Sequence, residues 1–337
     1  MKTVLAGLGR MGLRHYEVLQ SLDLELIGAA DPFEQARDSA VEAGISSDLL
    51  FDDAVKMIEQ TSPECVIVAT TAPYHRELVL AAAKAGAKAV MCEKPMGVSL
   101  AECDDMVEAC KASGTRLAVN HQMRFMEQYT WSKEIVSSEA FGGLSGISAM
   151  FGNFGLAMNG SHYFEMFRYM TDEDPVKVAA WFSKDTVSNP RGDQFVDHGG
   201  SVRLETASGK RFYMDASTDQ GHGMFVSYAG PNGRLDIDEL AGHTRLVLRE
   251  EEHRQQPTTR YGMPYETTIK DITPADAVAP TRSVMEALLK GENYPDGETG
   301  RLVLELLVAA YLSHEQDGKT IDLRTTDLPR DRVFPWA

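Results

Sequence analysis

The feature that most constrains this chain is a glycine-rich hexapeptide close to its N-terminus. The segment Gly7-Leu8-Gly9-Arg10-Met11-Gly12 has the spacing G-x-G-x-x-G, follows an apolar run over residues 3–6, and precedes a helical pattern. In a strand–turn–helix unit, the first glycine permits a tight turn, the second lets the backbone approach a pyrophosphate, and the third lets the helix pack on the strand. The N–H groups at the start of the helix favour phosphate. The hexapeptide therefore predicts a dinucleotide-binding turn made by Gly7, Gly9, Arg10, Met11 and Gly12.

An acidic residue follows at the distance expected for a second contact to the dinucleotide. Residues 24–30 form an apolar run typical of a strand, and Asp31 comes directly after it. A carboxylate at this place accepts hydrogen bonds from the adenine ribose and repels the 2′-phosphate of NADP. Asp31 therefore favours NAD over NADP as the cofactor. The alternative is that Asp31 only caps a helix that begins at Pro32.

Strands and helices alternate up to residue 120. This pattern predicts an α/β domain over residues 1–122, with a doubly wound parallel sheet of the Rossmann type and its ligand at the carboxyl ends of the strands. Helices are predicted over residues 32–43, 53–60, 78–85 and 100–112, and strands over residues 65–69, 89–92 and 116–120. Several residues that follow these strands are expected to contact the cofactor: Thr70, Thr71, Pro73, His75, Glu93, Lys94 and Gln122.

The second half of the chain has a different pattern. Turn signals such as Ser208-Gly209 and Pro231-Asn232-Gly233 separate runs rich in β-branched and aromatic residues, which predicts hairpins in an antiparallel sheet. We therefore expect a C-terminal α+β domain over residues 123–337. One face of such a sheet needs cover, which favours a homo-oligomer, either a dimer or a tetramer. Strands are predicted over residues 147–151, 176–183, 200–206, 211–217 and 225–230, and helices near 280–289 and 300–314.

Composition excludes several classes of partner. The net charge of −17 disfavours binding to nucleic acid or to anionic membranes, because both require a basic surface. No apolar run approaches the roughly 18 residues that a membrane span requires, and the N-terminus lacks the features of a signal peptide. Four cysteines without C-x-x-C spacing fit a reducing compartment, so we expect a cytoplasmic protein. No His, Cys and carboxylate cluster has metal-ligand spacing, so no metal is expected.

Six features occur together along the chain: the glycine hexapeptide, Asp31, the loop over residues 69–75, Glu93-Lys94-Pro95, Arg124-Phe125 and the segment 160–165. Together they resemble the Gfo/Idh/MocA oxidoreductases over essentially the whole chain, and the Glu-Lys-Pro tripeptide is the most specific of them. The resemblance implies an open, mostly antiparallel sheet in the second domain and a substrate held between the domains. It also implies hydride transfer between NAD and a hydroxyl or ketone of a sugar, polyol or sugar derivative.

Lys94 is the candidate for stabilising charge on the substrate oxygen. It follows a strand at the cofactor edge, and Pro95 restricts the backbone beside it. A lysine so placed donates to the substrate oxygen, and burial lowers its pKa toward the working range. The resemblance implies that this lysine helps to place both cofactor and substrate. The alternative is a surface lysine paired with Glu93.

His162 is the candidate proton acceptor, because imidazole titrates near neutrality. It begins an apolar helical stretch in which Glu165, three residues later, shares its face and is placed to orient the imidazole or contact the substrate. The alternative is a packing histidine on an amphipathic helix. Arg124 and Asn159 are further candidates for substrate contact.

The chain departs from the resembled family beside this histidine. Dehydrogenase members often carry Asp four residues before it and three residues after it, where this chain has Met158 and Glu165. Met158 cannot accept a proton, and Asn159 can form hydrogen bonds but cannot relay a proton. Either His162 works with Lys94 alone, or the scaffold runs other chemistry. The alternatives are an NAD-dependent glycoside hydrolase or lyase that oxidises the sugar transiently, and a non-catalytic NAD-binding regulator.

Overall fold

The computed structural model describes residues 1–22, 24–258 and 263–337. The chain folds into two compact units. The prediction placed all of residues 123–337 in a second domain, and the structure differs because two later segments pack with the first unit. The first unit consists of Met1–Gln122, Ala277–Glu305 and Pro329–Ala337, and the second of Met123–Asp276 and Leu306–Leu328. No helix among the described residues combines the length and apolar character needed to cross a membrane.

The first unit is built on a six-stranded parallel sheet with the order β3-β2-β1-β4-β5-β6. Its early elements match the predicted alternation closely, and α9 continues into the second unit. They are β1 (Lys2–Ala6), α1 (Arg10–Ser21), β2 (Glu25–Ala30), α2 (Glu34–Glu42), β3 (Leu50–Phe51), α3 (Ala54–Thr61), β4 (Cys65–Val68), α4 (His75–Lys84), β5 (Ala89–Cys92), α5 (Leu100–Ser113), β6 (Arg116–Val119), α8 (Val278–Lys290) and α9 (Gly297–Glu315).

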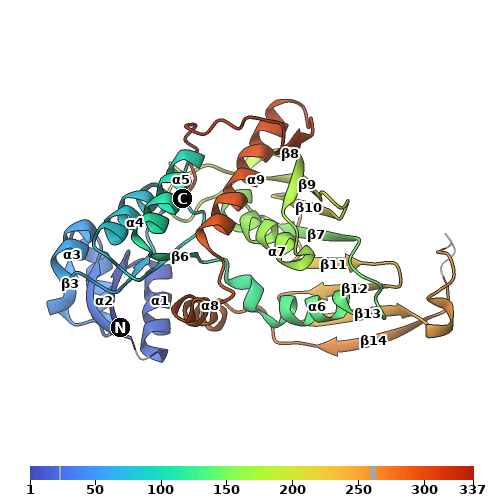
Figure 1. Ribbon diagram of the computed structural model, residues 1–337, viewed down its shortest axis with the longest axis horizontal. Helices are drawn as coiled ribbons and strands as arrows, with labels where there is room; N and C mark the ends of the chain where they lie inside the picture. The colour runs from blue at the N-terminus through green and yellow to red at the C-terminus, as the bar shows by residue number, and fades with distance from the viewer. Residues whose placement is uncertain (23, 259–262) are drawn as a thin grey trace. The chain divides into compact units, whose positions relative to one another are not determined.

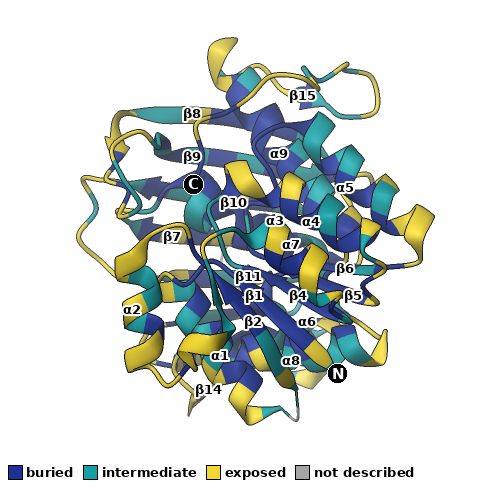
Figure 2. Cartoon of the chain, turned by 90° about the vertical axis from the view of Figure 1, so that its left-hand side faces the viewer, coloured by how far each residue is buried: buried dark blue, intermediate teal, exposed yellow. Residues whose placement is uncertain are grey.

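The central strands of this sheet are apolar throughout because helices cover both of its faces. Every residue of β4 and β5 is buried, as Figure 2 shows for the middle of the sheet, whereas exposed residues gather on the outer helices. The connection from β1 to β2 runs toward one edge of the sheet, and the connection from β4 to β5 runs toward the other edge. Right-handed crossovers then place α1 and α4 on opposite faces. Helices α3, α4 and α5 lie side by side in Figure 1.

The C-terminal segments complete this unit. Helix α8 packs against α1 and contacts β5 and β6. The final residues run along the start of α5: the Ala101 N–H donates to the Arg330 carbonyl at 3.0 Å, and the Phe334 N–H donates to the Val98 carbonyl at 2.9 Å. Trp336 is 1% exposed and stacks on Phe334. These contacts are the physical reason why the first unit extends beyond residue 122.

The second unit is built on a nine-stranded sheet with the order β14-β13-β12-β11-β7-β10-β9-β8-β15. Four strands and one helix of this unit (β12, β13, β14, β15 and α6) lay outside the predicted elements. The elements are α6 (Glu127–Ser137), β7 (Gly146–Gly152), α7 (Ser161–Thr171), β8 (Pro175–Val187), β9 (Asp197–Thr206), β10 (Arg211–Ser217), β11 (Phe225–Ala229), β12 (Gly233–Asp238), β13 (His243–Arg249), β14 (Tyr265–Asp271) and β15 (Ile321–Asp322).

Burial alternates along most of these strands because only one face of the sheet is covered. In β10, for example, Phe212, Met214 and Ala216 are buried, and the residues between them are partly or fully exposed. Helix α7 covers the buried face. Its Phe167 stacks on Phe212 with ring centroids 5.5 Å apart, and the ring centroids of Tyr163 and Phe151 are 4.2 Å apart. The unit therefore has a two-layer core of helix on sheet.

The sheet is mostly antiparallel, as predicted, with one exception. Residues 231–233 form the expected turn between β11 and β12, which pair antiparallel. Strands β7 and β10 instead pair in parallel, because α7 and the β8–β9 hairpin intervene between them. This crossover carries the helix that contains His162.

Candidate active site

The glycine hexapeptide forms a turn between β1 and α1. Gly7 has φ +93°, and a Cβ there would lie 2.7 Å from the backbone of Ala69, so only glycine fits. A Cβ on Gly12 would lie 1.9 Å from the Gly7 carbonyl oxygen, so the helix packs on the turn only without a side chain. A Cβ on Gly9 would meet nothing within 4 Å. A side chain therefore has no room at Gly7 or Gly12, whereas the space beside Gly9 is open, as a phosphate-binding turn requires.

Asp31 lies at the carboxyl end of β2 and binds two backbone groups. Its carboxylate accepts the N–H of Leu8 at 2.8 Å and that of Phe33 at 3.0 Å. Helix α2 begins at Glu34 with Phe33 as its N-cap, so Asp31 forms an Asx-type turn ahead of the helix and does not cap it. The Arg37 guanidinium donates to the Asp31 carbonyl at 2.7 Å. The Asp31 side chain thus joins the glycine turn to the end of β2.

His75 connects two loops that follow β4 and β5. Its Nε2 faces the Thr70 carbonyl at 3.0 Å, and its Nδ1 faces the Pro95 carbonyl at 3.1 Å. Burial lowers the pKa of His75, and a neutral imidazole carries only one N–H, so it donates to one loop at a time. The structure thus gives His75 a role in joining these loops. Pro73 lies in the short 3-10 turn just before His75, and Thr71 is the N-cap of that turn.

Glu93 is the centre of a buried polar cluster at the end of β5. Its Oε1 accepts a hydrogen bond from His15 Nε2 at 2.7 Å and from Asn120 Nδ2 at 2.8 Å. Burial by itself raises the pKa of Glu93, but the His15 hydrogen bond, the charges of His15 and Lys94, and Asn120 together lower it to about 2. Glu93 is therefore ionised, and its charge lies directly beside Lys94. The Lys94–Pro95 peptide bond is cis.

The carboxyl edge of this sheet fits a dinucleotide. The predicted cofactor residues follow β1, β2, β4, β5 and β6 in turn, and the chain reverses direction between β1 and β4, where open α/β sheets bind ligands. Buried polar atoms at this edge have no hydrogen-bond partner among the described residues: Thr70 Oγ1, Asn120 Oδ1 and Gln122 Oε1. Unpaired buried polar groups are costly, so a polar ligand is the expected partner. The open space at Gly9 fits the pyrophosphate.

His162 lies in the second unit, as the second residue of α7, and is 7% exposed. A π-helical turn over Leu156–Gly160 directly precedes the helix, and it contains Met158 and Asn159. Single π turns are rare and often occur at functional sites. The local structure around the proposed base is therefore unusual.

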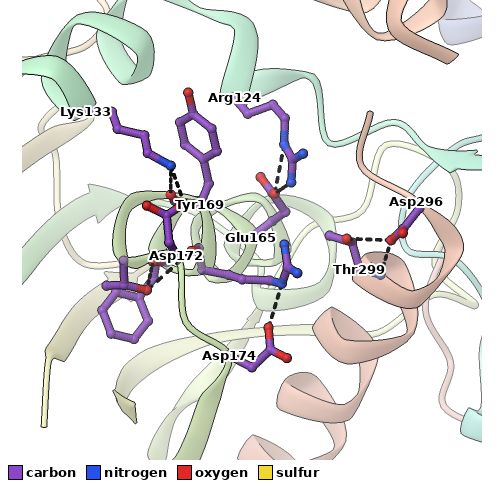
Figure 3. Close-up of polar contacts among 11 residues, drawn as sticks. Arg124, Lys133, Glu165, Tyr169, Asp172, Asp174, Asp296 and Thr299 are labelled. Carbon is purple, nitrogen blue, oxygen red and sulfur yellow. Dashed lines mark hydrogen bonds and ion pairs between the residues drawn. The ribbon is translucent and has the colours of Figure 1, made fainter. Parts of the chain in front are cut away.

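Glu165 and Arg124 form a buried ion pair beside Tyr169 (Figure 3). The Arg124 Nε donates to Glu165 Oε1 at 3.0 Å, and Nη2 donates to the same oxygen. Burial raises the pKa of Glu165, although the charge of Arg124 opposes this effect. Glu165 Oε2 has no hydrogen-bond partner among the described residues. Its second oxygen remains available to a hydroxyl donor.

The structure thus places the predicted site residues in two groups. The cofactor residues and Lys94 share the carboxyl edge of the parallel sheet, and Arg124, Asn159, His162 and Glu165 lie in the second unit around α7. One group of potential metal ligands occurs among the described residues, Glu250, Glu252 and His253, none of them buried. The absence of a functional metal remains a prediction.

Sequence reasoning missed the partners of Glu93. His15 is 0% exposed on α1, and Asn120 directly follows β6, where it also donates to Thr281 of α8 at 3.3 Å. A histidine on the buried face of α1 and a polar run after a buried strand were the available signals. Neither reveals its partner, because His15 and Glu93 are 78 residues apart in sequence.

Comparisons with known proteins agree with both units. A sequence profile of an oxidoreductase family, for its NAD-binding Rossmann fold, matches residues 1–121. The profile for the C-terminal α/β domain of the same family matches residues 152–323. Together they span most of the chain.

Two relatives and one solved structure match over most of their length. Myo-inositol 2-dehydrogenase from Thermotoga maritima is 29% identical over 271 residues, which cover 75% of this chain and 79% of the relative. D-apiose dehydrogenase from Paraburkholderia graminis is 27% identical, covering 97% and 90%. An oxidoreductase from Agrobacterium radiobacter, solved in complex with NAD+, L-tartaric acid and magnesium, has a TM-score of 0.79 at 18% identity, covering 96% and 98%. This structural likeness shows the fold.

Proposed function

Because the chain belongs to the Gfo/Idh/MocA oxidoreductase family, we propose that it transfers a hydride between NAD and a hydroxyl or ketone of a sugar, polyol or sugar derivative. The observation that carries this proposal is the order of groups along the parallel sheet. Asp31 follows β2, the open Gly9 follows β1, and Lys94 follows β5. These strands span about 14 Å at ordinary strand spacing. A dinucleotide laid from Asp31 across Gly9 would therefore bring its reactive ring toward Lys94.

The cofactor, when bound, accepts or donates the hydride, and the chain's residues position the substrate and move its proton. Lys94 places its ammonium group on the substrate oxygen, where it stabilises negative charge. His162 accepts the hydroxyl proton during oxidation. Glu165 Oε2 accepts a hydrogen bond from a further hydroxyl, and Arg124 keeps this carboxylate in place. Asn159 contributes a further hydrogen bond to the substrate. The relatives named for myo-inositol and D-apiose support a polyhydroxylated substrate.

The test is a panel of polyols, aldoses and glycosides incubated with the purified protein and NAD+, following NADH absorbance and product mass. We expect NADH to accumulate with at least one polyol or aldose. Release of an aglycone without NADH would instead favour the hydrolase or lyase alternative. Calorimetry that detects no binding of NAD+ would contradict the proposal.

Two variants test the assigned roles. Lys94→Ala and His162→Ala are each expected to reduce turnover by about 100-fold or more while NAD+ affinity changes little. Matched controls are Lys88→Ala and His243→Ala, which remove exposed side chains paired with Glu64 and Asp271. Wild-type turnover in both site variants would show that the assignment is wrong.

We also propose that the open sheet face joins copies of the chain into a homo-oligomer. Apolar side chains that are 40–53% exposed occur on four of its strands: Met150, Trp181, Tyr213 and Phe225. Met150 and Phe225 are direct cross-strand partners. Light scattering is expected to give a dimer or tetramer that Phe225→Lys weakens. Val333→Lys, at an exposed position of the first unit, is the control. A monomeric wild-type protein would contradict this.

A cytoplasmic location is proposed on the state of the cysteines. All four are free and buried, and burial raises the pKa of Cys65 and Cys110 to about 12. Thiols in this state fit a reducing compartment. Cell fractionation tests the location, and recovery of the protein outside the cytoplasm would contradict it.

A further inference from the structure

A pocket of about 320 Å³ lies at one end of the nine-stranded sheet. Residues of β12, β13 and the start of β14 line it, and these three strands lie side by side in Figure 1. None of the residues that line it belongs to the proposed active site. Small-molecule sites begin at a volume of about 300 Å³, so the pocket is large enough for a ligand of its own.

Strand pairing brings three arginines to this pocket. Arg245 and Arg249 are four residues apart on β13, so their side chains lie on the same face of the sheet. Arg234 of β12 pairs with Val247, the residue between them on that face. All three arginines line the pocket, and none of the described residues around it is acidic. This composition is unusual in a chain with 50 acidic and 33 basic residues.

Arg249 is the most buried of the three arginines, at 9% exposed. Its Nη2 donates to the carbonyls of Gln256 at 3.1 Å and Pro257 at 3.3 Å. Its Nε is buried and has no hydrogen-bond partner in the described parts of the chain. Carbonyl oxygens do not neutralise the guanidinium charge, and a buried charge without a counter-charge is costly. An anion is therefore the expected partner of Arg249.

The three arginines leave an excess of positive charge. Arg234 pairs with Asp236, whose Oδ2 lies 3.0 Å from the Arg234 Nε. Arg245 is exposed, and neither it nor Arg249 forms an ion pair within the described residues. Three guanidinium charges against one carboxylate leave an excess of two. A phosphate monoester carries a charge of about −1.5 to −2 at pH 7, whereas a carboxylate carries a single charge, so phosphate is the better match.

The other residues of the lining suit the carbon part of such a ligand. Guanidinium groups present their N–H donors in a planar fork that matches the oxygens of phosphate. Val247 lies between Arg245 and Arg249 on the same face, and Tyr265 pairs directly with Arg249 across β13 and β14. The Tyr265 side chain is 56% exposed, so its ring is accessible for packing on a sugar or a base.

We propose that Arg234, Arg245 and Arg249 form a binding site for a small organic phosphate, separate from the nucleotide turn of the first unit. The phosphate group binds the three guanidinium groups, and the carbon part packs on Val247 and Tyr265. Two kinds of ligand share this chemistry, a sugar phosphate and a nucleoside monophosphate. The inference does not depend on the proposed function, because no residue assigned to hydride transfer takes part.

Calorimetric titration of the full-length protein with inorganic phosphate, glucose 6-phosphate and AMP tests the site, with NAD+ in excess so that the glycine turn is occupied. Arg245→Gln removes a guanidinium that is not bonded to the rest of the described chain, and Arg249→Lys keeps the charge but removes Nε and the planar fork. Tyr265→Ala tests the packing of the carbon part. Arg324→Gln, at an exposed arginine paired with Asp322, gives the same change of net charge as Arg245→Gln and is the control.

We expect at least one organic phosphate to bind the wild type more tightly than inorganic phosphate, and the tighter of the two identifies the kind of ligand. Arg245→Gln and Arg249→Lys should each weaken its binding at least tenfold, because each removes charged hydrogen bonds. Arg324→Gln should change it less than twofold. Tyr265→Ala should reduce the affinity to that of inorganic phosphate. The melting temperature of Arg245→Gln without ligand should equal that of the wild type, since this side chain is exposed.

Three results would overturn the proposal. The first is that no phosphate binds the wild type, and the second is that Arg324→Gln weakens binding as much as Arg245→Gln, which would indicate a general attraction of charge. The third is that Arg245→Gln weakens an oligomer in light scattering while phosphate does not bind, which would assign the pocket to an acidic segment of a second copy.

Discussion

Glu93 in the first unit and Glu239 in the second are both buried carboxylates, but their surroundings differ. Glu93 binds His15 and Asn120 beside Lys94, and its pKa falls to about 2 despite burial. Glu239 accepts the hydroxyls of Tyr129 and Tyr163, each at 2.6 Å, and burial raises its pKa to about 7. The two tyrosine hydroxyls do not offset the desolvation of Glu239, whereas the His15 hydrogen bond and the charge of Lys94 favour the ionised form of Glu93. Burial alone therefore does not decide the charge of a carboxylate in this chain: Glu93 is ionised at neutral pH, whereas Glu239 is partly protonated.

The largest effect is expected from Glu93→Gln. The change weakens two buried hydrogen bonds to a charged acceptor, each worth about 1.5–3 kcal/mol, so the free energy of unfolding at pH 7 should fall by about 3 kcal/mol in urea titrations. Folding lowers the pKa of Glu93, so in the wild type its ionisation adds to the free energy of unfolding above about pH 4.5. This stabilisation is lost as the pH falls toward 2. The variant should lack this dependence. Glu64→Gln, at an exposed carboxylate, is the control. Equal free energies of unfolding for the two variants would show that the buried carboxylate of Glu93 adds no more stability than an exposed one.

The second prediction concerns Glu239, for which the pH dependence has the opposite sign. Because folding raises the pKa of Glu239, the folded state binds more protons than the unfolded state between about pH 4.5 and 7. The protonated Glu239 therefore stabilises the fold fully below about pH 4.5. As the pH rises through this window, the free energy of unfolding falls by roughly 3 kcal/mol. Unfolding measured across this range should show the loss in the wild type and not in Glu239→Gln. If the free energy of unfolding changes with pH equally in both proteins, another titrating group causes the dependence.

A third prediction separates the two kinds of glycine in the nucleotide turn. Gly9→Ala places a Cβ in open space, so the melting temperature should stay unchanged while NAD+ affinity falls at least tenfold, because the Cβ enters the space of the pyrophosphate. Gly12→Ala places its Cβ against the Gly7 carbonyl and should destabilise the fold itself. Calorimetry and thermal unfolding check both. Full NAD+ affinity in Gly9→Ala would argue against a cofactor at this turn.

The smallest effect is expected for cofactor choice. Asp31→Asn keeps an acceptor for the Phe33 N–H and removes the charge that repels a 2′-phosphate, while Arg37 remains beside it. We expect the ratio of NAD+ to NADP+ affinity to fall several-fold, up to about tenfold. Competition binding measures the ratio. An unchanged ratio would show that Asp31 only shapes the turn.

The sequence was informative where function depends on neighbouring residues. The glycine turn, Asp31 and the alternation of strands and helices are local patterns, and the six-stranded sheet confirms the predicted topology. The partners of the site residues were not predictable, because His15 meets Glu93 and Asp197 meets Met158 across long sequence separations. Strand β14 was missed for another reason: all of its residues are exposed, and only Tyr265 and Ile269 are large and apolar, so no apolar run marks it in the sequence.

The return of α8 and the final residues to the first unit has a consequence for how the protein must be made. Its nucleotide-binding half cannot be completed as soon as residues 1–122 have left the ribosome, because helix α8, which packs on α1, and the buried Trp336 follow residues 123–276 of the second unit in sequence. Until then that half exposes apolar surface, so its maturation is coupled to completion of the other half. A fragment that stops at residue 122 would carry the whole glycine turn and still lack part of the surface that keeps it folded.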